Sequence, residues 1–383
     1  MSLRSRAGRV AGLALGVAAT ALPAGAEARL LGDPGGARSD LERRGVTLQA
    51  FSNHFATWKV AGGADSSGEL GHSGSYDLFA LLDAERLVGA PGLSVLLHVK
   101  GQYDENVNPD VGALADPIDD ADFDRAVYVT ELWLEQALLA NRVRLRVGFL
   151  EQQTLFDRNA YANSEDRQFL ATALDNNPVV PLPNGLGAAL MLHPTDALEL
   201  ALGVGDAENV PGRSGFDTAF DGHDSLGAWA ETTLRVRPCG LPGSYRLGVF
   251  RDGRDDGHWG AYLSFDQLLL QEADAPDEGL GVFARFGKAD EDESRISWSW
   301  SAGLSYAGAL PGRSDDVLGL GVWQLSPSSR GADVARETGA ELYYAAAVLP
   351  WLTVTPAVQW IRDPGGEPTP DAVVTTLRMR VAF

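Results

Sequence analysis

Apolar and polar residues alternate with a period of two along most of this chain, from Val46 to the C-terminus. Such alternation predicts β-strands, because successive side chains of a strand point to opposite faces. In 297–306, for example, Trp298, Trp300 and Leu304 share one face, and serines occupy the other. The pattern predicts 16 strands, at 46–60, 75–87, 92–104, 127–139, 142–150, 185–193, 196–205, 226–237, 243–251, 258–270, 279–288, 295–307, 315–324, 336–348, 351–361 and 371–383.

Three features favour a transmembrane antiparallel β-barrel over a soluble β-sandwich. The polar faces carry Gly, Ser and Arg and the opposite faces carry Trp, Leu and Val, which suits a wet lumen and a lipid-facing exterior. Short turns alternate along the chain with longer loops, of which 151–184 is the longest. The chain stops at Phe383, on the apolar face of an amphipathic last strand. The fold class predicted is therefore all-β, a closed barrel of about 16 strands, because lipid cannot satisfy an open sheet edge.

Two local features refine the predicted barrel. Pro356 lies inside a predicted strand and cannot donate to the ladder, so we expect a bulge there. Much of the tryptophan lies near predicted strand ends, where it is expected to form interfacial girdles. These tryptophans are Trp58, Trp259, Trp298, Trp323, Trp351 and Trp360.

The first 28 residues have the pattern of a secretory signal peptide. Arginines precede an apolar run, Val10 to Leu22, that is short for a bilayer span of about 20 residues. Small residues follow, and cleavage is expected near 26–28. A periplasmic segment, 29–45, then contains one short helix that starts after Asp33 and ends at Gly45. The barrel is expected over 46–383.

The composition excludes several other classes of protein. The 383 residues include 52 acidic and 31 basic ones, a net charge of −21, which argues against nucleic-acid binding. One cysteine excludes a disulfide framework, and the six histidines show no metal-ligand spacing. No nucleophile elbow or phosphate loop is found, so we expect no enzyme activity, no cofactor and no metal site. Two acidic runs, Asp116–Asp124 and Asp290–Glu293, are expected in loops; they are either solvated or bind divalent cations, including cations that bridge lipopolysaccharide.

Several motifs resemble the carbohydrate-selective porin family (OprB family), over residues 30–383. The family usually has Trp where this chain has Pro34, and the residues after Gly148 lack the acidic and small residues expected there, which leaves the solute open. The resemblance implies a 16-stranded porin with a constriction selective for small sugars. The motifs are Leu31–Arg38 with Leu41 and Gly45–Val46, Glu131–Gln136 with Leu145–Gly148, and Glu341–Tyr344, Pro350–Leu352, Pro356 and Gln359–Gly366.

Charged residues on the polar faces of strands are the candidate pore-lining groups. Arg142, Arg144 and Arg146 form a basic ladder on a strand whose other face is apolar, so they are expected to face the lumen. Such groups can exchange hydrogen bonds with sugar hydroxyls in place of water. The alternative is that these charges pair with one another and only solvate the wall. The candidates that face the ladder are Glu131, Glu135, Arg378 and Arg380.

The loop 151–184 is long enough to suggest a function. By analogy with general porins it is expected to fold inward and narrow the pore; the alternative is an exposed loop. Phe156 and Tyr161 offer aromatic faces for a sugar, and Asp157 and Arg158 offer polar groups beside them.

These observations predict a passive porin in the outer membrane of a Gram-negative bacterium, for small carbohydrates and in particular monosaccharides. Its expected partners are small sugars, outer-membrane lipid and lipopolysaccharide, and the barrel-assembly machinery, which reads the C-terminal Phe383. The chain is expected to be a monomer or a homotrimer. The alternatives are a channel for anions or small acids, which would use the same arginines, an adhesin or structural anchor with active loops, and an outer-membrane enzyme.

Overall fold

The computed structural model describes residues 29–65, 70–103, 106–121, 124–208, 225–254, 257–272, 275–291, 294–328 and 335–383. The predicted signal peptide, 1–28, lies outside the described residues.

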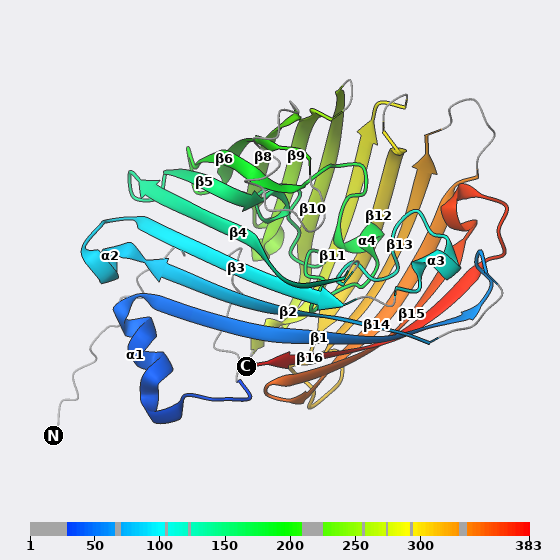
Figure 1. The fold of residues 1–383 in the computed structure, drawn as a ribbon, viewed down its shortest axis with the longest axis horizontal. Coiled ribbons are helices and arrows are strands. Elements are labelled where there is room, and N and C mark those ends of the chain that lie inside the picture. The colour runs from blue at the N-terminus through cyan, green and yellow to red at the C-terminus, as the bar shows by residue number, and fades with distance from the viewer. Residues whose placement is uncertain are drawn as a thin grey trace.

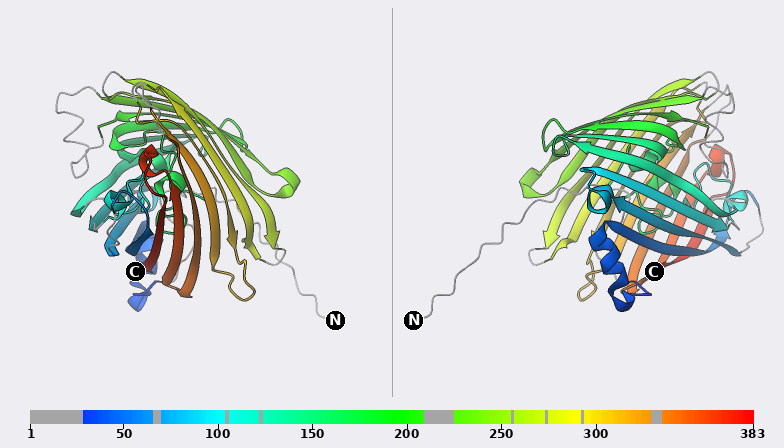
Figure 2. Two further views of the ribbon diagram at one scale, coloured as in Figure 1. Left: turned by 90° about the vertical axis from the view of Figure 1, so that its right-hand side faces the viewer. Right: turned by 60° about the vertical axis from the view of Figure 1, so that its left-hand side comes forward.

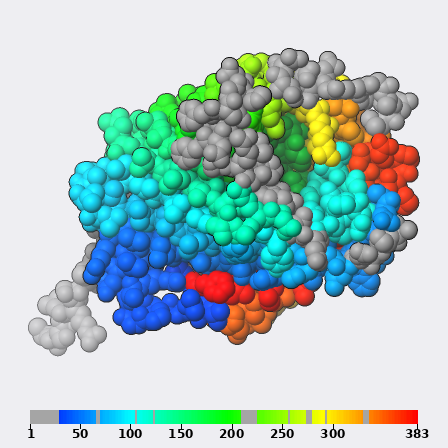
Figure 3. All heavy atoms as spheres, viewed as in Figure 1, coloured from blue at the N-terminus to red at the C-terminus, as the bar shows by residue number. Residues whose placement is uncertain are grey.

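Sixteen antiparallel strands form a closed barrel, as the alternation predicted (Figure 1). Each strand pairs with its neighbours in the chain, and β1 closes the ring against β16. In the space-filling view the blue N-terminal segment lies beside the red C-terminal one (Figure 3). The strands are β1 Val46–Ala61, β2 Leu70–Asp83, β3 Leu93–Tyr103, β4 Arg125–Leu138, β5 Val143–Glu151, β6 Asn184–Leu192, β7 Leu198–Asp206, β8 Leu226–Val236, β9 Gly243–Asp252, β10 His258–Glu272, β11 Ala275–Ala289, β12 Ile296–Ala307, β13 Val317–Pro327, β14 Glu337–Leu349, β15 Leu352–Arg362 and β16 Ala372–Ala382.

The two faces of the wall differ as a lipid-spanning barrel requires. Along β16, Arg378 and Arg380 are buried on the inside, and Leu377 and Met379 are exposed on the outside. Serines of β12 point inward and Trp300 points outward. An apolar exterior needs no hydrogen-bond partner from lipid, and closure pairs the backbone groups of both edges.

The helices are short and lie at the barrel ends or inside it. Helix α1 (Ala37–Arg44) follows the 3-10 turn η1 (Pro34–Gly36) and ends at Gly45, whose φ of 97° favours glycine. It lies at the same end of the barrel as the C-terminus (Figure 2). Helix α3 (Asn108–Val111) and helix α4 (Thr172–Asp175) belong to long connections. No helix among the described residues is long and apolar enough to cross a membrane.

Two local predictions are wrong. The second strand was expected to reach residue 87, but it ends at Asp83, whose carboxylate caps helix α2 (Ala84–Val88) by accepting from the Arg86 N–H. Pro356 causes no shift of register in β15. It points outward and is exposed, and only the ladder with β14 is interrupted beside it, so the missing N–H is tolerated without a bulge.

Two long connections fold into the barrel. We call residues 106–121, between β3 and β4, the first inner loop, and residues 152–183, between β5 and β6, the second inner loop. Helix α4, in the second inner loop, lies within the ring of strands and contacts β12 and β13 on the far wall (Figure 1). The inward fold expected for the second loop is therefore confirmed.

The inner loops and the wall together build an apolar core inside the barrel. Phe169 of the second inner loop packs edge-on against Tyr343 of β14, with ring centroids 5.0 Å apart. The loops contribute Val107, Val111, Ile118, Phe156, Phe169 and Leu174, and the wall contributes Phe55, Trp133, Trp229, Phe283, Trp323 and Tyr343. Trp323 is 1% exposed, so its expected place in an interfacial girdle is wrong, whereas Trp58, Trp259 and Trp360 are exposed on the outside.

Candidate functional site

The two arginines of β5 that form the basic ladder, Arg144 and Arg146, both pair with one glutamate of β4. Glu135 lies 2.6 Å from Arg144 and 3.0 Å from Arg146. Arg146 also stacks over the ring of Trp133, 3.9 Å from its centroid, and is 1% exposed. The pairing expected between this ladder and Glu135 is thus present. Burial withdraws Glu135 and Arg146 from direct contact with a solute, and the lumen-facing role of Arg144 stays a prediction.

Arg142 is not part of this ladder. It lies in the turn before β5, half-exposed, and pairs with Asp196 of the neighbouring turn at 3.0 Å. Its expected place in the lumen is wrong because β5 begins one residue later, at Val143.

Two arginines of β16 hold the second inner loop. Arg378 donates to the carbonyls of Glu165 and Gln168, both at 2.9 Å. Arg380 bonds the Asp166 carboxylate at 2.7 Å. Burial opposes ionisation of Asp166, but Arg380 and Arg167 hold its pKa well below the usual range. These arginines, expected to face the basic ladder of β5, bind the second inner loop instead.

Two glutamates of β14 that the sequence analysis did not single out as site residues also bind the inner loops. Glu341 accepts the N–H groups of Leu170 and Ala171, at 2.8 and 2.9 Å. Glu337, four residues earlier on the same inward face, accepts the N–H of Leu114 at 2.6 Å. The sequence could have revealed these two residues, because two acids on the polar face of an expected membrane strand need partners inside the barrel.

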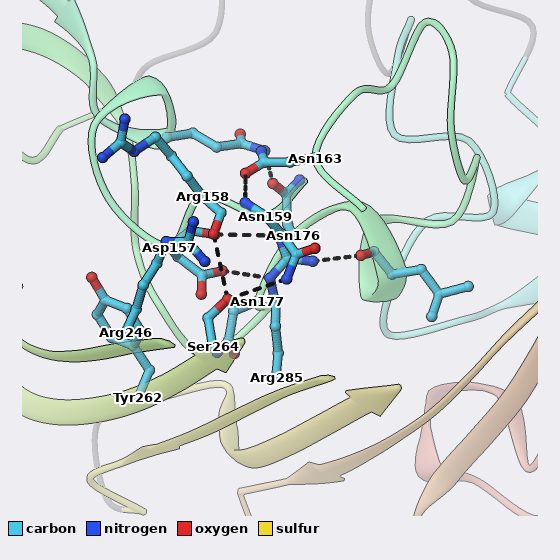
Figure 4. A network of polar contacts seen from close by, with 12 residues as sticks. Asp157, Arg158, Asn159, Asn163, Asn176, Asn177, Arg246, Tyr262, Ser264 and Arg285 are labelled. Carbon is cyan, nitrogen blue, oxygen red and sulfur yellow. Dashed lines mark hydrogen bonds and ion pairs between the residues drawn. The ribbon is translucent and has the colours of Figure 1, made fainter. Parts of the chain in front are cut away.

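The start of the second inner loop is bound by the opposite wall (Figure 4). Asp157 pairs with Arg285 of β11 at 3.0 Å, and its N–H donates to Glu231 of β8 at 2.8 Å. Tyr262 of β10 donates to the same carboxylate at 2.8 Å. Burial raises the pKa of Asp157 to about 7, against the opposing effect of Arg285.

The remaining predicted loop residues are anchored in the same way. Phe156 is fully buried and packs against Trp229, so its ring is not the sugar-facing surface that was expected. Arg158 pairs with Glu199 of β7 at 2.5 Å. Tyr161 is partly buried and packs over Gly281, where a Cβ would lie 2.1 Å from its ring. Glu131, expected beside the arginines, interacts electrostatically with Arg146 and also lies 3.6 Å from His98.

A cavity of about 540 Å³ lies between the two inner loops and the wall, at the end of the barrel that carries the long connections. Its polar lining includes Asp116 and Asp119, so these two members of the first acidic run lie inside the barrel and not on an outer surface. Asp120 is also inside, 1% exposed. The cavity is lined by Leu114, Ala115, Asp116, Asp119, Thr172, Pro178, Val179, Pro181, Asp252, Arg254, His258, Ser294, Arg295 and Ile296.

A closed barrel of 16 antiparallel strands with inner loops fixed across its lumen is the architecture of a porin. Comparison with known proteins gives the particular family. The chain belongs to the carbohydrate-selective porin, OprB family, whose sequence model matches residues 67–255 and 250–383. A porin of this family is a transport channel of the bacterial outer membrane, not an enzyme.

Individual relatives cover nearly the whole chain. Porin B of Pseudomonas aeruginosa is 23% identical over 92% of this chain and 91% of its own. A putative porin, QuiX, of Acinetobacter baylyi is 23% identical over 92% and 93%. Among solved structures, the high-pH structure of Pseudomonas putida OprB is similar, with a TM-score of 0.82 and 20% identity over 92% of this chain and 97% of that one.

Proposed function

We propose that this porin passes small neutral sugars, monosaccharides in particular, by passive diffusion. The observation that carries the proposal is a cavity of about 540 Å³ between the wall and two inner loops that fold into the lumen. This volume falls within the range of about 300–1,000 Å³ typical of small-molecule sites. A solute that passes through this cavity would shed part of its water and contact the lining.

The lining of the cavity suits a polyol. Asp116, Asp119, Arg254 and His258 supply hydrogen-bond donors and acceptors that can replace water around hydroxyl groups. Val179 lies among prolines and offers apolar surface for the C–H faces of a sugar ring. Binding of this kind orients a ring without requiring a net charge on the solute.

The pairing of the inner arginines argues against a channel for anions. Arg144 and Arg146 share Glu135, and Arg246 pairs with Asp266 at 2.6 Å. Acids within hydrogen-bond distance offset two of these three positive charges, which weakens the positive field that an anion channel would need. The adhesin hypothesis loses support as well, because both inner loops fold into the barrel and bind its inner wall.

Swelling of proteoliposomes in isotonic sugars tests the proposal. We expect a pentose and a hexose to enter several-fold faster than a disaccharide, and a trisaccharide to be nearly excluded. Liposomes without protein and liposomes with a general porin are the controls. Entry that does not depend on sugar size, or no entry, would contradict the proposal. A reversal potential set by the chloride gradient would favour the anion channel instead.

We also propose how the protein is exported and how its barrel is assembled in the outer membrane. Residues 1–28 are removed as a signal peptide near 26–28, and 29–45 stay in the periplasm, where Arg38 bonds the carbonyl of Phe383 at 3.2 Å. Phe383, on the outward face, is the signal for the barrel-assembly machinery. The N-terminal sequence of the mature protein is expected to begin between Glu27 and Arg29, and a start at Met1 would contradict this cleavage.

The chain is a monomer or a homotrimer, and cross-linking in outer membranes distinguishes the two states. Lipopolysaccharide that copurifies with the protein would support contact with that lipid.

A further inference from the structure

Three side chains with metal-binding groups meet on the inner wall beside the second inner loop. His98 of β3, Glu131 of β4 and Glu151 at the end of β5 have candidate ligand atoms that all lie within 4.8 Å of one another. His98 and Glu131 are register partners on adjacent strands. The three residues lie on successive strands and form no short sequence motif, so the spacing of histidines along the chain did not reveal them.

The imidazole of His98 is held as a metal-binding histidine is held. Its Nε2 lies 2.8 Å from Oδ1 of Asp77, and its ring stacks on Phe79 with centroids 3.8 Å apart. A carboxylate on one ring nitrogen orients the ring and directs the other nitrogen to a metal. That other nitrogen, Nδ1, has no hydrogen-bond partner, although His98 is only 6% exposed. Its nearest charged group is the Glu131 carboxylate, beyond hydrogen-bond distance, and a metal ion between the two would satisfy this buried nitrogen.

The carboxylate of Glu131 is oriented toward this nitrogen. Trp133 donates its Nε1–H to Oε1 of Glu131 at 2.9 Å, and Oε2 faces His98 Nδ1 at 3.6 Å. This separation is too long for a hydrogen bond. It is close to the distance of about 3.4 Å between two ligands of a tetrahedral ion with bonds of about 2.1 Å.

The charges at the site favour a dication. Asp77, Glu131 and Glu151 bring three carboxylates around one imidazole. The neighbouring Lys100 pairs with Asp120 at 2.9 Å and with Glu165 at 2.7 Å, both on the inner loops. One imidazole nitrogen and two carboxylate oxygens form a donor set that suits Zn²⁺ and similar transition metals better than Ca²⁺ or Mg²⁺, which prefer oxygen alone.

We propose that His98, Glu131 and Glu151 bind a divalent transition-metal ion of the Zn²⁺ class on the inner wall of the barrel. Asp77 and Trp133 orient two of the ligands. Water completes the coordination. Glu151 immediately precedes the 3-10 turn η2 (Gln152–Thr154) with which the second inner loop begins. The ion therefore ties the root of that loop to β3 and β4, independently of the solute that the pore carries.

Calorimetric titration with ZnCl2 of the detergent-purified, EDTA-stripped protein tests this site. We expect one equivalent of Zn²⁺ to bind, with release of protons from the ligands. Asp77→Asn, which keeps the shape of the side chain, is expected to weaken binding about 10–100-fold. His98→Gln and Glu151→Gln are expected to weaken it by more than that. Co²⁺ is expected to give visible absorption bands in the wild type and none in His98→Gln.

The control variant is His54→Gln with His72→Gln, which removes two histidines that stack at 6.3 Å elsewhere on the barrel. It is expected to bind Zn²⁺ as the wild type does. No binding by the wild type, equal binding by His98→Gln and the wild type, or loss of binding in the control would overturn the proposal. The heat-dependent gel shift of a folded barrel checks each variant. If His98→Gln does not fold, Glu151→Gln carries the test, because Glu151 is partly exposed and ends its strand.

Discussion

Glu341→Ala is expected to widen the pore and raise its single-channel conductance several-fold. The fully buried carboxylate of Glu341 accepts two backbone N–H groups of the second inner loop. Hydrogen bonds to a charged group each contribute about 1.5–3 kcal/mol, so the loss of both weakens docking of the loop by about 3–6 kcal/mol. The change also leaves two donors without partners. We expect the loop to detach from β14 and the trisaccharide to enter proteoliposomes at a measurable rate.

Two comparisons make this result specific to Glu341. Glu272→Ala removes an exposed glutamate at the other end of the barrel and is expected to leave conductance unchanged. Glu337→Ala removes the corresponding contact with the first inner loop and is expected to add to the effect of Glu341→Ala. An unchanged conductance and an unchanged size limit in Glu341→Ala would show that the apolar core alone holds the second inner loop in place.

Arg146→Ala is expected to destabilise the barrel by about 2–4 kcal/mol, because it removes a buried hydrogen bond between charged groups, about 1.5–3 kcal/mol, and a cation–π contact of about 0.5–1 kcal/mol. Glu135, which is fully buried, would keep only Arg144. The stacking of the guanidinium on Trp133 would be lost as well. The midpoint of urea unfolding, followed by tryptophan fluorescence in detergent, measures this change.

Arg142→Ala is the matched comparison, because Arg142 lies four residues away from Arg146 and differs from it chiefly in burial. Its ion pair with Asp196 is exposed on both sides, and such pairs contribute about 0–1 kcal/mol. We expect no measurable shift of its midpoint. Equal shifts of the unfolding midpoint in the two variants would mean that the positive charge of the arginine sets its contribution to stability and that the burial of its ion pair does not.

The wall of this barrel could be predicted from sequence because its signal is local. Each strand alternates within its own ten or so residues, and lipid on one side makes the pattern strict, as Leu377 to Arg380 illustrate. The predicted strand bounds and the predicted bulge were wrong where two local preferences of the backbone compete. Asp83 starts a helix by capping it. Pro356 keeps its strand in register because its missing N–H interrupts only the ladder with β14 and leaves the ladder with β16 intact.

The interior could be predicted only in part, because its contacts join residues far apart in the chain. That Arg378 and Arg380 face inward follows from alternation, but that they bind Glu165, Asp166 and Gln168 does not. The arrangement of His98, Glu131 and Glu151 depends on the register of three strands, which periodicity alone does not set. Phe156 likewise gives no sign in sequence of the apolar core that buries it.

The long reach of these contacts has a consequence for how the channel matures. The second inner loop leaves the wall between β5 and β6, yet Leu170 and Ala171 bind Glu341, which lies 170 or more residues later in the chain. Contacts of such separation form late, because the ends must first be brought together. The constriction can thus assemble only once β14 to β16 are in place. A barrel that has not yet closed has no selectivity, so the step that seals the seam between β1 and β16 also sets the size limit of the channel.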